Sequence, residues 1–171
     1  RSKIRVRIIS RNANDAFGAP FFRRRVQYAW DYRKAVMGPD TACCRVIFGE
    51  ADHFPGLTVD KFGDILVTQT MSLGLEKVKP LVFPLLVQAI EKDGQPIRGI
   101  YERNDGKLRE LEGLEQGKGW FPLEGRPTPE STVTEIVENG IRYRVDVENG
   151  QKTGFFLDQK YNRAAAAKIA P

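Results

Sequence analysis

Apolar positions in the first third of the chain change from a two-residue period to a helical one. Between Lys3 and Ser10, β-branched residues alternate with basic residues. Because successive side chains of a strand point to opposite faces, this alternation predicts a half-buried strand with a basic outer face. From Phe21 to Met37 the apolar residues recur near helical spacing, which predicts a helix. Gly38 and Pro39 then mark the end of the helix and a boundary.

A second group of apolar segments follows this boundary. Strands are predicted at Cys43–Phe48, Leu57–Asp60, Ile65–Thr70 and Arg98–Arg103, an apolar helix at Leu75–Lys92, and a short turn or helix at Leu108–Leu114. The long helix contains Pro80 and Pro84, so we expect it either to begin near the first proline or to bend at the second. The order strand-strand-strand-helix-strand predicts an α+β fold with a mainly antiparallel sheet.

A linker, a hairpin and a helix are predicted for the last third of the chain. Gly113–Pro129 holds four glycines and three prolines, which is typical of a loop. Asn139 and Gly140 separate two alternating runs, and this dipeptide is the strongest hairpin signal in the chain. The two hairpin strands are expected at Thr132–Val137 and Ile141–Val147. Asp158 stands where it can cap a helix over Gln159–Ala170.

The overall composition is typical of a globular protein. Hydrophobic residues make up 41% and charged residues 29% of the chain, and no apolar run is long enough to span a bilayer. No signal peptide is apparent, so a cytoplasmic location is expected. Cys43 and Cys44 are adjacent on a predicted strand, so we expect two reduced thiols, at least one of them buried, and no disulfide. His53 is the only histidine, so no metal site is expected.

Positive charge is concentrated near the start of the chain. Residues 1–34 carry ten basic and two acidic side chains, a net charge of +8, whereas the whole chain has a net charge of +5. This asymmetry predicts a polyanionic partner for the N-terminal segment alone. A solvated basic surface without a partner is the alternative.

The segment from Gly150 to Arg163 is the most informative for chemistry. Two glycines bracket three polar residues, two phenylalanines follow, and a predicted helix start completes the segment. Such a turn exposes backbone N–H groups and the positive end of a helix, which suit a carboxylate or a phosphate. A hairpin-to-helix connection with two core phenylalanines explains the same residues equally well. A phosphate-binding loop is excluded, because no glycine stands directly before Lys152.

Two clusters of charged residues favour structural roles. The first comprises Glu50, Asp52, Asp60 and Asp64. Glycine and proline lie between these carboxylates, which favours turns over paired-carboxylate catalysis. The second comprises Glu102, Arg103, Asp105 and Arg109, and ion pairs at a strand end are expected there.

Four stretches resemble one bacterial family. In chain order they are PFFRRRVQYAWDYRK, FGEADHFPGLTVDKFGD, IYERNDGKLRELEGL and GQKTGFFLDQKYNR. The last stretch closely resembles the motif that precedes the catalytic sheet in bacterial class I SAM-dependent large-subunit rRNA methyltransferases. That family carries an N-terminal PUA domain, a small α+β central domain and a Rossmann-like catalytic domain. His53 departs from the family pattern, which has a small residue or glycine at this position. This difference affects only the expected conformation of the loop that contains His53.

The resemblance implies three parts. Residues 1–37 would be the C-terminal part of a PUA-like RNA-binding domain, 41–128 the central α+β domain, and 132–171 the hairpin and helix that lead into the methyltransferase domain. The family's glycine-rich acidic loop and catalytic cysteine have no counterpart here. Because Cys43 and Cys44 lie outside any matching motif, no catalytic residue is assigned. The chain is therefore expected to be an inactive part of a longer enzyme.

The resemblance also implies S-adenosyl-L-methionine as cofactor and C5 of a cytosine in large-subunit rRNA as methyl acceptor. The residues expected to line the cofactor pocket are Lys152, Thr153, Phe155, Asp158, Gln159 and Arg163. Those expected to contact RNA phosphates are Lys3, Arg5, Arg7, Arg23, Arg24 and Arg25. A non-catalytic RNA-binding or scaffold module is the alternative, and the alanine-rich helix after an aromatic turn favours the enzyme. The oligomeric state stays open, a homodimer included.

Overall fold

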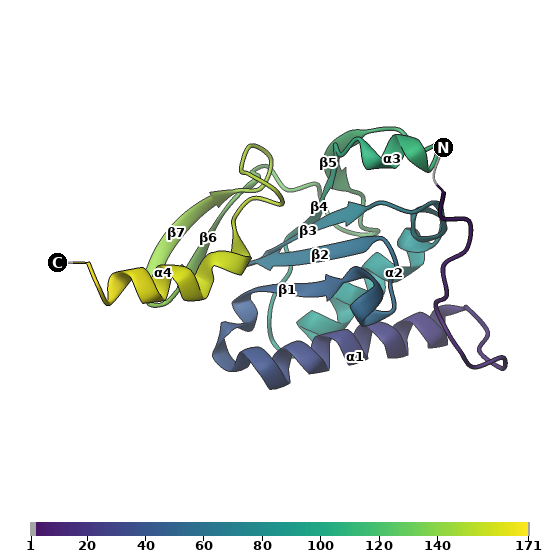
Figure 1. Cartoon of the computed structure of the whole chain (residues 1–171), viewed down its shortest axis with the longest axis horizontal. Helices are drawn as coiled ribbons and strands as arrows, with labels where there is room; N and C mark the ends of the chain where they lie inside the picture. Colours follow the sequence, from purple (N-terminus) through teal and green to yellow (C-terminus); the bar gives the residue numbers. More distant parts are fainter. Residues whose placement is uncertain (1–2, 171) are drawn as a thin grey trace.

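A five-stranded sheet forms the centre of the fold, and two long helices lie against one of its faces (Figure 1). The computed structural model describes residues 3–170. The strands lie in the order β1 Cys43–Phe48, β2 Leu57–Phe62, β3 Ile65–Thr70, β4 Gly99–Asn104 and β5 Gly117–Phe121. Only β3 and β4 are parallel neighbours, and helix α2 joins them. The predicted α+β class with a mainly antiparallel sheet is confirmed.

Helix α1, Ala19–Met37, packs against α2 and β1 in one hydrophobic core. Trp30 at its centre is fully buried, and the indole N–H donates to Asp93 Oδ2 at 2.8 Å. The helix predicted at Phe21–Met37 is thus confirmed. The division into domains at residues 37–41 stays a prediction, but α1 and the sheet pack as one unit.

The second core lies on the opposite face of the sheet, beneath a two-stranded hairpin. Its strands are β6 Val133–Glu138 and β7 Ile141–Asp146, so the predicted hairpin is confirmed. Strand alternation divides the residues between the two cores: Leu66 faces the helices, whereas Ile65 faces the hairpin. Cys44 and Cys43 divide in the same way. Both cysteines are free and buried, as expected from their adjacent positions on a strand.

Helix α2 spans Leu73–Glu91 and runs through both prolines. It begins before Pro80, because Ser72 caps its first turn by accepting a hydrogen bond from the Leu75 N–H. The expectation of a start near Pro80 is therefore wrong. Apolar residues on most sides of α2 are buried, and this packing outweighs the loss of backbone hydrogen bonds at the prolines.

The strand predicted at Lys3–Ser10 is absent, and this prediction is wrong. Ile4, Val6 and Ile8 are each more than half exposed. Alternation stabilises a strand only where a neighbouring strand completes the hydrogen bonds, and within residues 3–170 none lies beside this segment.

The loop predicted at Gly113–Pro129 contains edge strand β5, which is a second correction. Its Trp120 packs edge-on against Tyr101 of β4, with ring centroids 5.1 Å apart. A Cβ on Gly99 would lie 3.0 Å from the Trp120 ring, so glycine permits this close approach. Gly99 of β4 therefore accommodates this aromatic pair, and the glycines of the predicted loop do not prevent β5 from forming.

The C-terminal helix is shorter than predicted and lacks the expected cap. A 3₁₀ turn at Leu157–Gln159 leads into α4, Lys160–Ala167. The Asp158 side chain makes no capping bond; it faces Lys152 and Gln159 instead. The remaining short elements are the 3₁₀ turns Gly38–Ala42 and Gly49–Asp52 and helix α3, Leu108–Leu111. No helix of the described part of the chain combines the length and apolarity needed to cross a bilayer.

Candidate functional site

The hairpin β6–β7 carries the segment expected to line the cofactor pocket. Asn139 and Gly140 at its turn have φ angles of 53° and 79°, as the favoured two-residue hairpin turn requires. Asn139 Nδ2 also donates to the carbonyl of Lys160 at 3.0 Å, which ties the turn to α4. Hairpin and helix lie together beside one end of the sheet (Figure 1).

The glycine-bracketed turn after β7 is a tight loop. The N–H of Gly150 donates to Asp146 O, and the N–H of Gly154 donates to Gln151 O, both at 2.8 Å. A Cβ on Gly150 would lie 2.3 Å from Gly154 O, so only glycine fits there. Lys152 adopts the left-handed conformation at φ 55° and projects into solvent.

Thr153 joins this turn to the central sheet. Its hydroxyl donates to Asp60 Oδ2 at 2.6 Å, and both residues are buried. Arg45 holds the same carboxylate through Nε at 2.8 Å and Nη2 at 3.0 Å. Hydrogen bonding to Asp60 raises the pKa of Arg45. The Thr153 side chain therefore faces the protein interior and positions the turn.

Arg163 forms a second internal connection. Its guanidinium binds the buried carboxylate of Glu138 through two hydrogen bonds of 2.6 and 2.9 Å, and it donates to the carbonyl of Phe156 at 2.8 Å. The ion pair with Glu138 raises the pKa of Arg163. The guanidinium also lies 4.5 Å from the ring centre of Phe155, which packs in turn on Tyr143. Arg163 and Phe155 thus fix the shape of the segment.

The remaining predicted cofactor residues, Lys152, Asp158 and Gln159, reach solvent. Lys152 Nζ lies 3.5 Å from Asp158 and 4.5 Å from the ring centre of Phe156. A hydrogen bond from Gln159 is the main cause of the lowered pKa of Asp158. Lys152 and Asp158 line a groove of about 520 Å³ together with residues of α1, β1 and α4. Lys152 and Asp158 therefore place a cation and a carboxylate at the solvent-exposed side of this hollow, which is also lined by Arg33, Arg45 and Lys160.

Sequence reasoning missed the internal partners of this site. Asp60, Arg45 and Glu138 hold Thr153 and Arg163, and Lys160 pairs with Asp40 as a largely buried cation. No local pattern identifies these pairs, because each joins residues far apart in the sequence.

The residues expected to contact RNA divide by exposure. Lys3 and Arg5 are exposed. Arg7 instead pairs with Glu50 at 3.4 Å and Glu112 at 3.3 Å, so it holds the N-terminal segment against the fold.

The three consecutive arginines of α1 each have a partner. Arg23 donates to Gln88 Oε1 at 3.1 Å, and Arg24 pairs with Asp15 at 3.0 Å. Arg25 donates to the carbonyl of Ile9 at 3.4 Å and lies 5.2 Å from the ring centre of Phe21. Of these partners only Asp15 is acidic, so the end of α1 keeps a positive charge.

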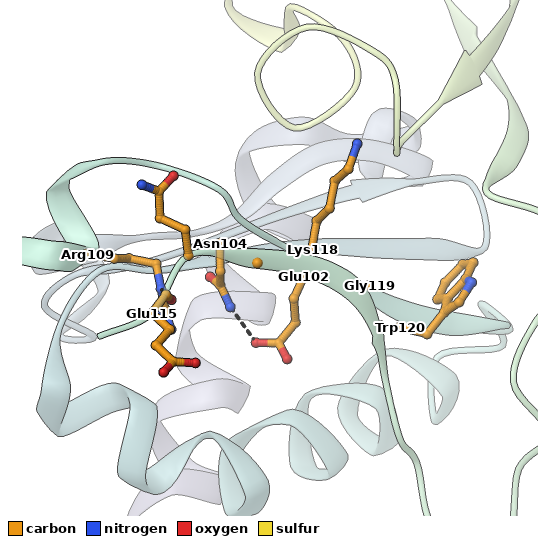
Figure 2. A pocket seen from close by; sticks show the side chains of 9 residues that line it. Glu102, Asn104, Arg109, Glu115, Lys118, Gly119 and Trp120 are labelled. Carbon is orange, nitrogen blue, oxygen red and sulfur yellow. Dashed lines mark hydrogen bonds between the residues drawn. The ribbon is translucent and has the colours of Figure 1, made fainter. Parts of the chain in front are cut away.

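A separate polar pocket of about 270 Å³ lies beside β4 and β5 (Figure 2). Glu102 Oε1 accepts hydrogen bonds from Lys79 at 2.7 Å and from Asn104 at 2.8 Å. Arg109 is buried and donates to Glu76, the carbonyl of Glu115 and that of Thr70. These groups connect α3 and β5 to α2, which supports the structural role expected for this cluster.

Metal ligands do not gather anywhere in residues 3–170: no three His, Cys, Asp or Glu side chains meet as a metal site requires. Burial is the main cause of the raised pKa values of Cys43 and Cys44, about 12 and about 11. A nucleophilic or metal-binding thiol needs the opposite shift.

The chain is similar to known methyltransferases along nearly its whole length. Ribosomal RNA large subunit methyltransferase I of Aliivibrio fischeri is 39% identical over 169 residues, and that of Alteromonas mediterranea is 41% identical over 170 residues. These matches cover 98% and 99% of this chain but only 40% of each relative. No family model matches the chain.

Solved structures agree in fold. A Streptococcus mutans protein assigned to the SAM-dependent methyltransferases superposes with a TM-score of 0.70 at 24% identity, over 92% of this chain and 38% of that protein. A second protein assigned as a methyltransferase, solved in complex with SAH, gives a TM-score of 0.69 at 25% identity, over 91% and 37% of the two chains. The chain is therefore a homologue of one part, about two fifths in length, of large-subunit rRNA methyltransferases.

Proposed function

We propose that this chain is the RNA-binding and central part of a SAM-dependent methyltransferase that modifies C5 of a cytosine in large-subunit rRNA. The observation that carries the proposal is the continuous similarity to rRNA methyltransferases over 98% of the chain. It includes the turn and helix from Gly150 to Arg163, whose buried contacts hold Lys152 and Asp158 at the edge of a groove.

S-adenosyl-L-methionine is the proposed cofactor, and it supplies an electrophilic methyl group when bound. The exposed side chains suit it: Lys152 offers a cation for its carboxylate, and Asp158 offers an acceptor for a hydroxyl. The Phe156 ring beside Lys152 adds an apolar wall. Thr153 and Arg163 would act by positioning, because their polar atoms bind Asp60 and Glu138.

Methyl transfer to C5 of cytosine needs a nucleophile that this part of the protein does not supply. Attack on C6 requires a thiolate, and burial raises the pKa of Cys43 to about 12 and that of Cys44 to about 11. Neither thiol is ionised at neutral pH. We therefore propose that the chain alone is inactive and that another part of the parent protein carries the nucleophile.

RNA binding is proposed for the basic N-terminal third. Lys3 and Arg5 are exposed, and the arginines Arg23 and Arg24 of α1 lie on the solvent side. Arg7 would contribute less, because it already pairs with two carboxylates. The division into a PUA-like part at 1–37, a central part at 41–128 and the start of the catalytic part at 132–171 belongs to the same proposal, as does a cytoplasmic location beside the ribosome.

The test is methyl transfer by the product of the complete gene that encodes this chain. The substrate is rRNA from a strain that lacks the gene, and the methyl donor is isotope-labelled S-adenosyl-L-methionine. We expect the complete product to label large-subunit rRNA at cytosine C5 and residues 1–171 alone to transfer nothing. A complete product that labels no rRNA would refute the proposal and favour a non-catalytic RNA-binding module.

A further inference from the structure

Two adjoining hollows form one groove along helix α1. The first, about 470 Å³, is lined by Arg25, Tyr28 and His53, among others. The second, about 520 Å³, is the one that contains Lys152 and Asp158. Tyr32, Arg33 and Phe48 line both hollows, so the groove leads from the middle of α1 to the proposed cofactor segment.

Four aromatic side chains are exposed along this groove. The exposed fractions are 59% for Tyr28, 59% for Tyr32, 56% for Phe48 and 73% for Tyr161. Tyr28 and Tyr32 are one helical turn apart and therefore share a face of α1. Single exposed aromatics are common on protein surfaces, but four along one groove indicate a binding surface.

Cations accompany three of these rings. The guanidinium of Arg33 lies 5.0 Å from the ring centre of Tyr32, and that of Arg45 lies 5.3 Å from that of Phe48. Lys160 Nζ lies 6.0 Å from the ring centre of Tyr161. Asp52, Asp60 and Asp40 pair with these three cations and hold them beside the rings.

The charge of α1 favours an anionic occupant. The helix carries five basic side chains and one acidic side chain, Asp31. Arg25 lines the groove, and within residues 3–170 its partners are the carbonyl of Ile9 and the ring of Phe21 rather than a carboxylate. The acidic partners of Arg33, Arg45 and Lys160 offset those three charges, whereas the exposed rings offer contacts that do not depend on charge.

We propose that this groove binds an unpaired RNA strand, with bases stacked on Tyr28, Tyr32, Phe48 and Tyr161 and a phosphate near Arg25. Aromatic rings beside cations along a groove are the means by which proteins hold single strands without reading sequence. The strand would run toward Lys152 and Asp158, so it would bring an unpaired nucleotide to the cofactor side of the protein. This inference rests on the proposed function, because it assigns the RNA a conformation and a path.

Binding of a labelled oligouridine of about ten nucleotides by residues 1–171, measured by fluorescence anisotropy, tests the groove. We expect Tyr28→Ala with Tyr32→Ala to weaken binding about five- to tenfold for each ring lost. Tyr28→Phe with Tyr32→Phe keeps both rings and should bind like the wild type. The control Leu108→Ala removes an exposed apolar side chain on α3 and should also leave affinity unchanged.

Two results would overturn the proposal that this groove binds an unpaired RNA strand. One is a Tyr28→Ala, Tyr32→Ala double variant that keeps its thermal stability and binds oligouridine within about twofold of the wild type. The other is tighter binding of a duplex RNA of equal charge than of the single strand, since a duplex cannot stack its bases on side chains.

Failure of the groove and failure of the proposed function give different results. If the complete gene product methylates rRNA while the alanine variants bind and methylate like the wild type, only the proposal that the groove binds RNA is wrong. If oligouridine binding depends on the two rings while the complete product transfers no methyl group, RNA binding by the groove is supported and the methyltransferase proposal fails.

Discussion

The hydroxyl of Thr153 donates a 2.6 Å hydrogen bond to the buried carboxylate of Asp60, 93 residues earlier in the chain. Because Arg45 binds the same carboxylate, one acceptor connects β1, β2 and the turn after β7. The turn that presents Lys152 to solvent is thereby fixed to the central sheet.

Thr153→Val should destabilise the protein by about 1–3 kcal/mol, because Asp60 loses a buried hydrogen bond and valine restores only the shape. Urea unfolding followed by circular dichroism measures the change. The control is Thr128→Val at an exposed position, which should leave stability unchanged. Equal unfolding midpoints for wild type and Thr153→Val would contradict the role given to this bond.

Arg163→Met should lower the free energy of unfolding by about 3 kcal/mol, because it leaves the buried Glu138 carboxylate without its charge partner. Arg163→Lys keeps the charge but loses the two-point contact, so its loss should be smaller. Arg142→Met on the exposed side of β7 is the matched control. If Arg142→Met and Arg163→Met lower the thermal midpoint equally, the ion pair with Glu138 contributes no more to stability than an exposed arginine does.

Both cysteines should resist thiol reagents in the folded protein. Their pKa values are raised to about 12 and about 11, so the reactive thiolate is scarce at neutral pH, and both side chains are buried. Reaction with a colorimetric disulfide reagent should be slow without denaturant and complete in urea. Rapid modification of one thiol in the folded protein would show that Cys43 or Cys44 is accessible after all.

Acid should weaken the turn after β7 through Asp146. Hydrogen bonds from Asn149, Glu148 and Thr132 lower the pKa of Asp146, the Asn149 side chain most of all. A lowered folded-state pKa stabilises the fold above the unfolded value of about 3.9, and this contribution disappears as pH falls through the folded value.

Urea unfolding of the wild type and of Asp146→Asn, from neutral to acidic pH, tests this pH dependence. The free energy of unfolding of the wild type should exceed that of the variant most near neutral pH, and the difference should shrink as pH falls. A constant difference between the two curves at every pH would mean that ionisation of Asp146 does not stabilise the turn.

Replacing Arg23, Arg24 and Arg25 with alanine should flatten the salt dependence of RNA binding. Each lost phosphate contact lowers the slope of log K against log salt by about 0.7 for a single strand. Anisotropy titrations at several salt concentrations measure this slope, with Lys77→Ala on α2 as the exposed basic control. An unchanged slope in the triple variant would exclude RNA contacts through this part of α1.

Elements with a strong local signal could be predicted from the sequence. Helix α1 follows from helical spacing of apolar residues, and the β6–β7 hairpin follows from Asn139 and Gly140, whose positive φ angles the turn requires. Lys3–Ser10 shows the limit of such patterns. Alternation is necessary for a half-buried strand, but pairing with a distant strand decides whether it forms.

The candidate site was only partly accessible to sequence reasoning. The segment Gly150–Arg163 could be identified, but not which of its side chains face solvent. Thr153 and Arg163 turn inward toward Asp60 and Glu138, and those partners lie 93 and 25 residues away in the chain. Likewise, the exposure of Tyr28 and Tyr32 depends on how α1 lies on the sheet.

Deletion of the complete gene, followed by mapping of 5-methylcytosine in large-subunit rRNA, tests the central claim most directly. We predict that one cytosine loses its methyl group in the deletion strain and regains it when the gene is restored. Restoring residues 1–171 alone should leave that cytosine unmethylated. An rRNA methylation map identical in the deletion strain and its parent would contradict the account.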